Sequence, residues 1–183
     1  MTRLKNLTHT IVTYFGSPDS PNLGRLWGLF WVYPAIASLM VQLIILPYIY
    51  PEWHDGGGVL IQGDSQAYHW TAVEIAEEIS DQGWSVWKYW LREIHGFVPS
   101  YFAAAIYAVT TPELWTLIPI NAALHATATL LLFLIIKNLL RDWRMAIMTV
   151  LPFWLFPSAM NWYTQIHKDG ISIFGTYLFL YAC

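Results

Sequence analysis

Two short polar segments hold the residues that could do chemistry. The first is Gly63-Asp64-Ser65, a polar loop that follows a long apolar run and precedes an amphipathic stretch. The second is His167-Lys168-Asp169, which precedes another apolar run. A carboxylate held at the edge of an apolar region is a candidate general base, and a second carboxylate or a cation nearby strengthens that interpretation. Asp64 and Asp169 are therefore the candidate catalytic residues.

Each polar group also has an ordinary structural explanation. Asp is favoured at helix N-caps, so Asp64 could simply cap the helix that is predicted to follow it. Lys168 could extend its charge to water and pair with Asp169 at a helix end. Asn121 and His125, four residues apart in an apolar run, are assigned to packing between helices. We favour the functional explanation for the two acidic residues because both are expected on the same face of the protein.

The composition excludes a soluble globular domain. Of the 183 residues, 56% are hydrophobic and only 11% are charged. A helix of about 20 apolar residues crosses about 30 Å of hydrocarbon, and Leu26–Leu46 and Trp115–Ile136 meet that length without a formal charge. Met145–Tyr163, with two prolines, is a third candidate span, and Ile171–Cys183 begins a fourth. The predicted fold class is all-α: a polytopic membrane protein with about four transmembrane helices.

The basic residues predict the orientation in the membrane. An excess of Lys and Arg marks cytoplasmic segments; the chain has three before the first span and three between the second and third spans, namely Arg3, Lys5, Arg25, Lys137, Arg141 and Arg144. Residues 47–114 and 161–170 are then outside, and they carry ten of the twelve acidic residues. The chain is divided into a cytoplasmic segment, residues 1–25, and a transmembrane module, residues 26–183. The net charge of −3 itself says nothing of nucleic acid, and no nucleic-acid partner is expected.

The first outer segment is predicted to contain interfacial helices. Residues 51–63 form a loop rich in glycine. Ser65–Ile79 is an amphipathic helix that lies along the membrane, with Trp70, Val73, Ala76 and Ile79 on its apolar face. A cluster of aromatic residues that favours the headgroup layer follows: Trp84, Trp87, Tyr89 and Trp90. Pro99–Val109 is a second helix at the outer surface, because it is too short to cross.

No cofactor is indicated by the sequence. Several histidines of the outer segments could supply metal ligands: His54, His69, His95 and His167. No two of them have the four-residue spacing of a helical metal site. A divalent metal is therefore left unsupported.

The order of the parts resembles the GT-C superfamily of membrane glycosyltransferases, such as the protein O-mannosyltransferases and the aminoarabinose transferases. The similarity covers residues 26–183. It includes an acidic residue in the first outer loop, here Gly63-Asp64-Ser65-Gln66-Ala67-Tyr68, and a proline-led segment, here Val98-Pro99-Ser100-Tyr101. The similarity also includes the asparagine-led segment Asn121–Ile136 of the second span and the basic turn after it. Pro157-Ser158 at the end of the third span, followed by Lys168-Asp169, completes it. Family members usually have many more spans.

The resemblance implies transfer of a sugar from a polyprenyl-phosphate carrier to an acceptor on the outer face, with inversion at the anomeric carbon. Asp64 would be the base, and Asp169 would orient the acceptor or Lys168. The implied substrate-binding residues are Lys168, His167, Tyr68, Lys88 and Arg92, the cations serving the departing phosphate. The implied location is the bacterial inner membrane, with membrane lipid as a partner. Asp64 and Asp169 should then lie within about 10 Å of each other.

Two other functions are consistent with the composition. A non-catalytic membrane subunit would use its 11 Trp residues for anchoring and for contact with other membrane subunits. A transporter or polymerase of lipid-linked sugars would need charges deep in its spans, and the first two apolar runs contain none. The last apolar run, Ile171–Cys183, is too short to cross about 30 Å of hydrocarbon, so the chain is expected to be the N-terminal part of a longer protein.

Overall fold

The computed structural model describes residues 16–17, 20–55, 57–61, 63–92, 97–156 and 164–183. Nearly all the regular structure of this part of the chain is helical, which confirms the predicted all-α class. The longest helices are α2 (Leu23–Met40), α3 (Asp64–Gln82), α6 (Ile118–Leu140), α7 (Trp143–Leu155) and α9 (Lys168–Ala182). Two-residue strands, β1 (Gly16–Ser17) and β2 (Ser20–Pro21), pair in antiparallel fashion before α2.

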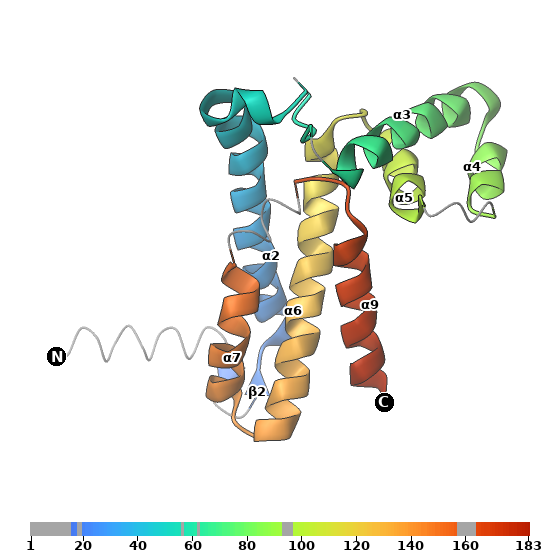
Figure 1. Ribbon diagram of the computed structural model, residues 1–183. Helices are drawn as coiled ribbons and strands as arrows, with labels where there is room; N and C mark the ends of the chain where they lie inside the picture. Colours follow the sequence, from blue (N-terminus) through green and yellow to red (C-terminus); the bar gives the residue numbers. More distant parts are fainter. Residues whose placement is uncertain (1–15, 18–19, 56, 62, 93–96, 157–163) are drawn as a thin grey trace.

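The helix α6 is the centre of a bundle. The helices α2, α7 and α9 all pack against it (Figure 1). The core between α2, α6 and α7 consists of Leu26, Phe30, Ala126, Phe133, Ala146 and Val150. Small residues such as Ala126 and Ala146 let helix backbones approach closely, as is common between membrane helices. His125 of α6 bonds the Trp154 carbonyl of α7 at 3.3 Å, in agreement with its assignment to packing.

Two helical segments are long and apolar enough to cross a membrane: Leu23–Ile49 and Leu114–Leu140, each of 27 residues. They contain the first two predicted spans. The first includes a π-helix, η1 (Val41–Ile49), that continues α2, and the second begins with the 3₁₀ helix η3 (Leu114–Leu117). The helices α7 and α9 have 13 and 15 residues, or about 20 Å and about 22 Å at 1.5 Å per residue. Two spans are supported on this criterion, and the predicted count of four is not confirmed.

The prediction that a third span runs to Tyr163 does not match the helix that the structure shows. The helix α7 ends at Leu155, and Phe156 is extended, with φ −62° and ψ 115°. Pro157 follows, and the residue before a proline is driven out of the helical conformation by the proline ring. Residues 157–163 lie outside the described part of the chain. The fourth predicted helix begins at Lys168, three residues earlier than expected.

A second helical unit lies at one end of the bundle and contains α3, the short helix α4 (Ser85–Trp90) and α5 (Val98–Tyr107). In Figure 1, α3 runs away from the end of the bundle, roughly across its axis, and it packs on α5. This outer unit has its own core: Val59, Tyr68, Ala72, Ile75, Ala76, Ile79, Tyr101, Ala103, Ala104, Tyr107, Leu114, Leu117 and Ile166. The two predicted outer helices therefore exist, with boundaries shifted by one to three residues.

The predicted apolar face of α3 is only partly correct. Ala76 and Ile79 are buried, but Trp70 is 52% exposed. A strict three-residue step drifts around a helix of 3.6 residues per turn. The buried stripe instead alternates steps of three and four and includes Tyr68, Ala72 and Ile75.

The bundle separates basic from acidic segments. Arg25 in the first turn of α2, Arg141 at the end of α6 and Arg144 in the first turn of α7 gather at one end (Figure 1). The outer unit, with its acidic α3, lies at the opposite end. This charge separation is the one that the positive-inside rule requires. Which end faces the cytoplasm stays a prediction from the charges.

Gly58 joins the loop before α3 to the end of the first long helix. Its φ is 82°, which disfavours any residue with a side chain, and a Cβ atom there would overlap the buried side-chain amide of Gln42 in η1. We expect Gly58→Ala to lower the free energy of unfolding by about 2 kcal/mol, since the left-handed backbone alone costs about 1–2 kcal/mol. Thermal unfolding of the detergent-solubilised protein measures it.

The neighbouring glycine is the matched control. Gly57 lacks a positive φ, and a Cβ atom there would lie 3.5 Å from the Asp55 carboxylate, an ordinary contact. Gly57→Ala should therefore leave the midpoint of unfolding nearly unchanged. Equal effects of the two substitutions would contradict the contact between Gly58 and Gln42.

Candidate functional site

Asp64 is the first residue of α3 and does not cap it. The N-cap is Gly63, whose φ of 125° and ψ of 177° suit only glycine, and no side chain caps this end. The structure thus excludes the simplest structural explanation for Asp64. Its exposed carboxylate lies in the first turn, where the unpaired N–H groups of the helix favour a negative charge.

The second polar segment forms the start of α9. His167 is the extended N-cap residue, with φ −137°, and its side chain makes no capping hydrogen bond. Lys168 and Asp169 are the first two helical residues; the lysine is exposed and the aspartate is half-buried. Both candidate acids therefore lie in the first turn of a helix that has no side-chain cap.

His167 connects the two acidic residues electrostatically. Burial lowers the pKa of this half-buried histidine below its usual value, while the charges of Asp169 and Asp64 act in the opposite direction. Two carboxylates that influence the same imidazole must both lie in its surroundings. Asp64 at the start of α3 and Asp169 at the start of α9 thus both act on the charge of His167, and we refer to these three residues as the cluster. Because its pKa is lowered, His167 is neutral near pH 7, and Lys168 is the cation that α9 supplies.

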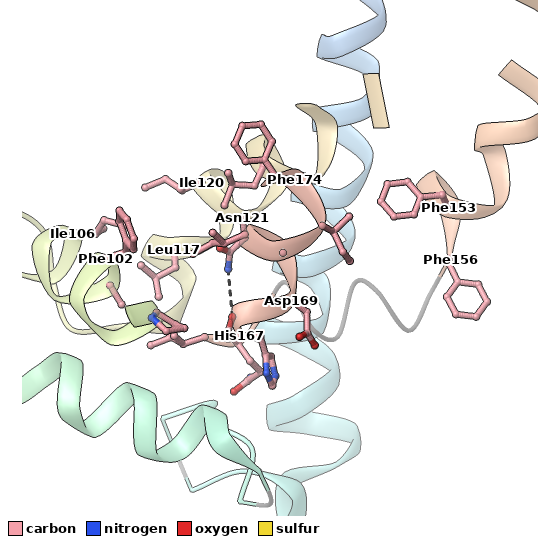
Figure 2. A pocket seen from close by; sticks show the side chains of 18 of the residues that line it. Phe102, Ile106, Leu117, Ile120, Asn121, Phe153, Phe156, His167, Asp169 and Phe174 are labelled. Carbon is pink, nitrogen blue, oxygen red and sulfur yellow. Dashed lines mark hydrogen bonds between the residues drawn. The ribbon is translucent and has the colours of Figure 1, made fainter. Parts of the chain in front are cut away.

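An apolar cavity of about 620 Å³ lies beside this cluster. This half-open cavity is lined by α5, α6, the end of α7 and the start of α9, and Figure 2 shows His167 and Asp169 at its boundary. The walls are mainly aromatic and aliphatic: Phe102, Ile106, Ile120, Phe153, Phe156 and Phe174. A concave apolar site with a few polar groups at one side is the usual form of a site for an amphiphilic ligand.

Three residues of the sequence prediction lie apart from this cluster. Lys88 is on α4 and Arg92 follows that helix, and both are exposed. In Figure 1, α4 lies at the far end of α3 from Asp64, about 27 Å of helix away, with α5 between α4 and the bundle. Tyr68 is buried in the outer core, where its ring meets Phe97 edge to face at 5.7 Å. None of the three lines the cavity, and neither do Asp64 and Lys168; of the predicted residues, His167 and Asp169 line it.

The histidines considered as metal ligands have other surroundings. Within the described ranges, no group of three or more His, Cys, Asp or Glu residues is arranged to hold a metal ion. His69 is buried and its Nδ1 lies 3.1 Å from the Tyr107 hydroxyl, so this pair links α3 to α5. Burial lowers the pKa of His69 and raises that of Tyr107. His95 is outside the described residues.

Gln165 is a part of the site that the sequence did not reveal. Its side chain is 1% exposed and bonds the main chain of residues 58 and 60. The main-chain carbonyl of Gln165 accepts a hydrogen bond from the Asn121 side chain at 3.3 Å, which is drawn in Figure 2. A glutamine two residues before His167 was visible in the sequence, but no spacing rule connects residues more than 100 positions apart.

Comparison of the chain with family models, with curated proteins and with solved structures found no match. The functional proposal below therefore depends on the geometry of the cluster and the cavity, together with the motifs noted in the sequence.

Proposed function

We propose that this protein is a membrane glycosyltransferase that moves a sugar from a polyprenyl-phosphate carrier to an acceptor at the outer face of the membrane. The observation that carries the proposal is the apolar cavity lined at one side by Asp169 and His167, on whose imidazole Asp64 also acts. A donor of this class has an apolar chain, a phosphate and a sugar. The cavity suits the first prenyl units, the polar groups of the cluster suit the sugar, and the cation Lys168 at the start of α9 suits the phosphate.

The residues can be assigned to the steps of a single displacement. The acceptor oxygen attacks the anomeric carbon, and the bond from that carbon to the phosphate oxygen breaks, which inverts the configuration. Asp64 takes the proton of the acceptor hydroxyl, because it is exposed and free of a capping role. The polyprenyl phosphate leaves with its negative charge, and Lys168, the first residue of α9, stabilises that charge. Asp169 orients Lys168 or the acceptor.

Filling the cavity should weaken binding of the carrier lipid. Leu124 of α6 is half-buried and lines the cavity. We expect Leu124→Trp to weaken binding of polyprenyl phosphate about tenfold or more, because the indole occupies space that the prenyl chain needs. Native mass spectrometry of the purified protein with added polyprenyl phosphate measures the affinity.

The control is on the same helix. Leu139 is 73% exposed, near the opposite end of α6. Leu139→Trp should bind polyprenyl phosphate as the unmodified protein does. If both variants bound polyprenyl phosphate equally well, the lipid would not be bound in the cavity. No binding to the unmodified protein would favour the non-catalytic membrane subunit instead.

A further inference from the structure

We propose that Gln165 is a positioning residue, which ties the loop before α3 to the segment before α9 and thereby sets the placement of Asp64 relative to His167. Its effect on sugar transfer rests on the proposed function. Its effect on the placement of Asp64 does not, and the two are tested separately.

The side-chain amide of Gln165 makes two hydrogen bonds to the main chain of the loop, one as acceptor and one as donor. Its Oε1 accepts a hydrogen bond from the Leu60 N–H at 3.1 Å, and its Nε2 donates to the Gly58 carbonyl at 2.9 Å. The same Nε2 lies 3.4 Å from the Thr164 hydroxyl. One buried side chain thus satisfies a donor and an acceptor of a segment 107 residues away in sequence. Such a pair of bonds fixes both distance and direction.

The loop that Gln165 holds is also closed by hydrogen bonds of its own. The Asp55 N–H bonds the Val59 carbonyl at 3.1 Å, and the Ile61 N–H bonds the Trp53 carbonyl at 3.0 Å. These bonds close the loop into a small hairpin, which Gly58 can turn because its φ is positive. Asp64 is four residues after Leu60, so it lies at most about 14 Å of extended chain from the residue that the Gln165 amide holds.

Gln165 is also close to His167 in the chain, since Ile166 alone separates the two residues. Ile166 and Val59 are both buried in the outer core, so apolar packing already holds the two segments together. Packing is not directional, however, and would allow one segment to slide over the other. The bonds of the Gln165 amide select one register, and that register places Asp64 near His167.

The experiment measures whether Asp64 still acts on His167 when the amide is removed. The full chain in nanodiscs carries six histidines, and isotope-labelled rings can be titrated by NMR, with His167→Gln identifying the signal. In the unmodified protein, Asp64→Asn should move the titration of His167 to lower pH, because the carboxylate raises its pKa. In a Gln165→Met background, the same substitution should produce no such shift.

Two further variants keep the result interpretable. Gln82, exposed in the last turn of α3, is the matched control, and Gln82→Met should preserve the response to Asp64→Asn. Gln165→Asn retains a buried amide but is one methylene shorter, so it should fold if Gln165→Met does not, yet lose the response. An equal shift in the presence and absence of the Gln165 amide would overturn the proposal. If the response depends on Gln165 but no donor lipid binds, the positioning role stands and the proposed function fails.

Discussion

Asp64→Asn is expected to lower the rate of sugar transfer by about 10²–10⁴-fold, the usual effect of losing a general base. An amide has nearly the size of the carboxylate but cannot take the proton of the acceptor hydroxyl. Asp64 does not cap α3 and is exposed, so the fold should not depend on it. Initial rates with a polyprenyl-phosphate-linked sugar measure the effect, and binding of the carrier lipid should be unchanged.

A second acid on the same helix is the control for this substitution. Asp81 is exposed in the last turn of α3, at the end remote from the cavity. Asp81→Asn removes the same charge and should leave the rate within about twofold, because a distant surface charge is screened by salt. A near-normal rate of sugar transfer by the Asp64→Asn variant would show that Asp64 is not the general base.

Lys168→Gln is expected to lower the rate by about 10²–10³-fold, the range found when one group that stabilises a developing negative charge is lost. Lys168 is the exposed first residue of α9, between His167 and Asp169 in the chain, and in the proposed function its ammonium group binds the phosphate. Lys168→Arg keeps the positive charge and should retain more activity than Lys168→Gln. Product release from a polyprenyl-phosphate-linked sugar is the measurement.

Lys88→Gln is the control that tests whether the effect of Lys168→Gln is local or would follow from the loss of any positive charge. Lys88 is also exposed, but it belongs to α4, and α5 lies between α4 and the bundle (Figure 1). Its removal should leave the rate within about twofold, since the two sites are separated by more than a Debye length of about 8 Å. A large loss with Lys88→Gln and none with Lys168→Gln would place the phosphate near α4 instead.

The elements that the sequence predicted best are those that depend on a repeated property. The lengths of Leu26–Leu46 and Trp115–Ile136 follow from a run of apolar residues, and both lie inside helices of 27 residues. The start of α3 was expected near Ser65 because glycine and polar residues precede a periodic segment, and the helix begins one residue earlier. Periodicity was less reliable for side chains, as the exposure of Trp70 shows.

The arrangement of the candidate site depends on tertiary contacts that no local pattern encodes. His167 was visible beside Asp169 in the sequence, but its proximity to Asp64 requires that α3 and α9 begin side by side. That arrangement is held by Gln165, whose partners are more than 100 residues away. Neither the periodicity nor the composition of the sequence predicts hydrogen bonds of this kind, so they can be recognised only in the folded structure. The position of Lys88 and Arg92, at α4 and away from the cluster, likewise depends on how the helices pack and could not be read from a local pattern.

The division of apolar residues between the outer unit and the bundle bears on how the protein loses its structure. In the described part of the chain, the two hydrophobic clusters have no residue in common. One is expected at the aqueous surface, where urea acts, and the other within lipid or detergent, which shields it. The outer unit can therefore open in a sub-global transition while the bundle remains folded. Amide hydrogens of α3 and α5 should then exchange with solvent sooner than those of α6. Because Asp64 belongs to the unit that opens first, a preparation could keep most of its helical circular dichroism and already lack an assembled site.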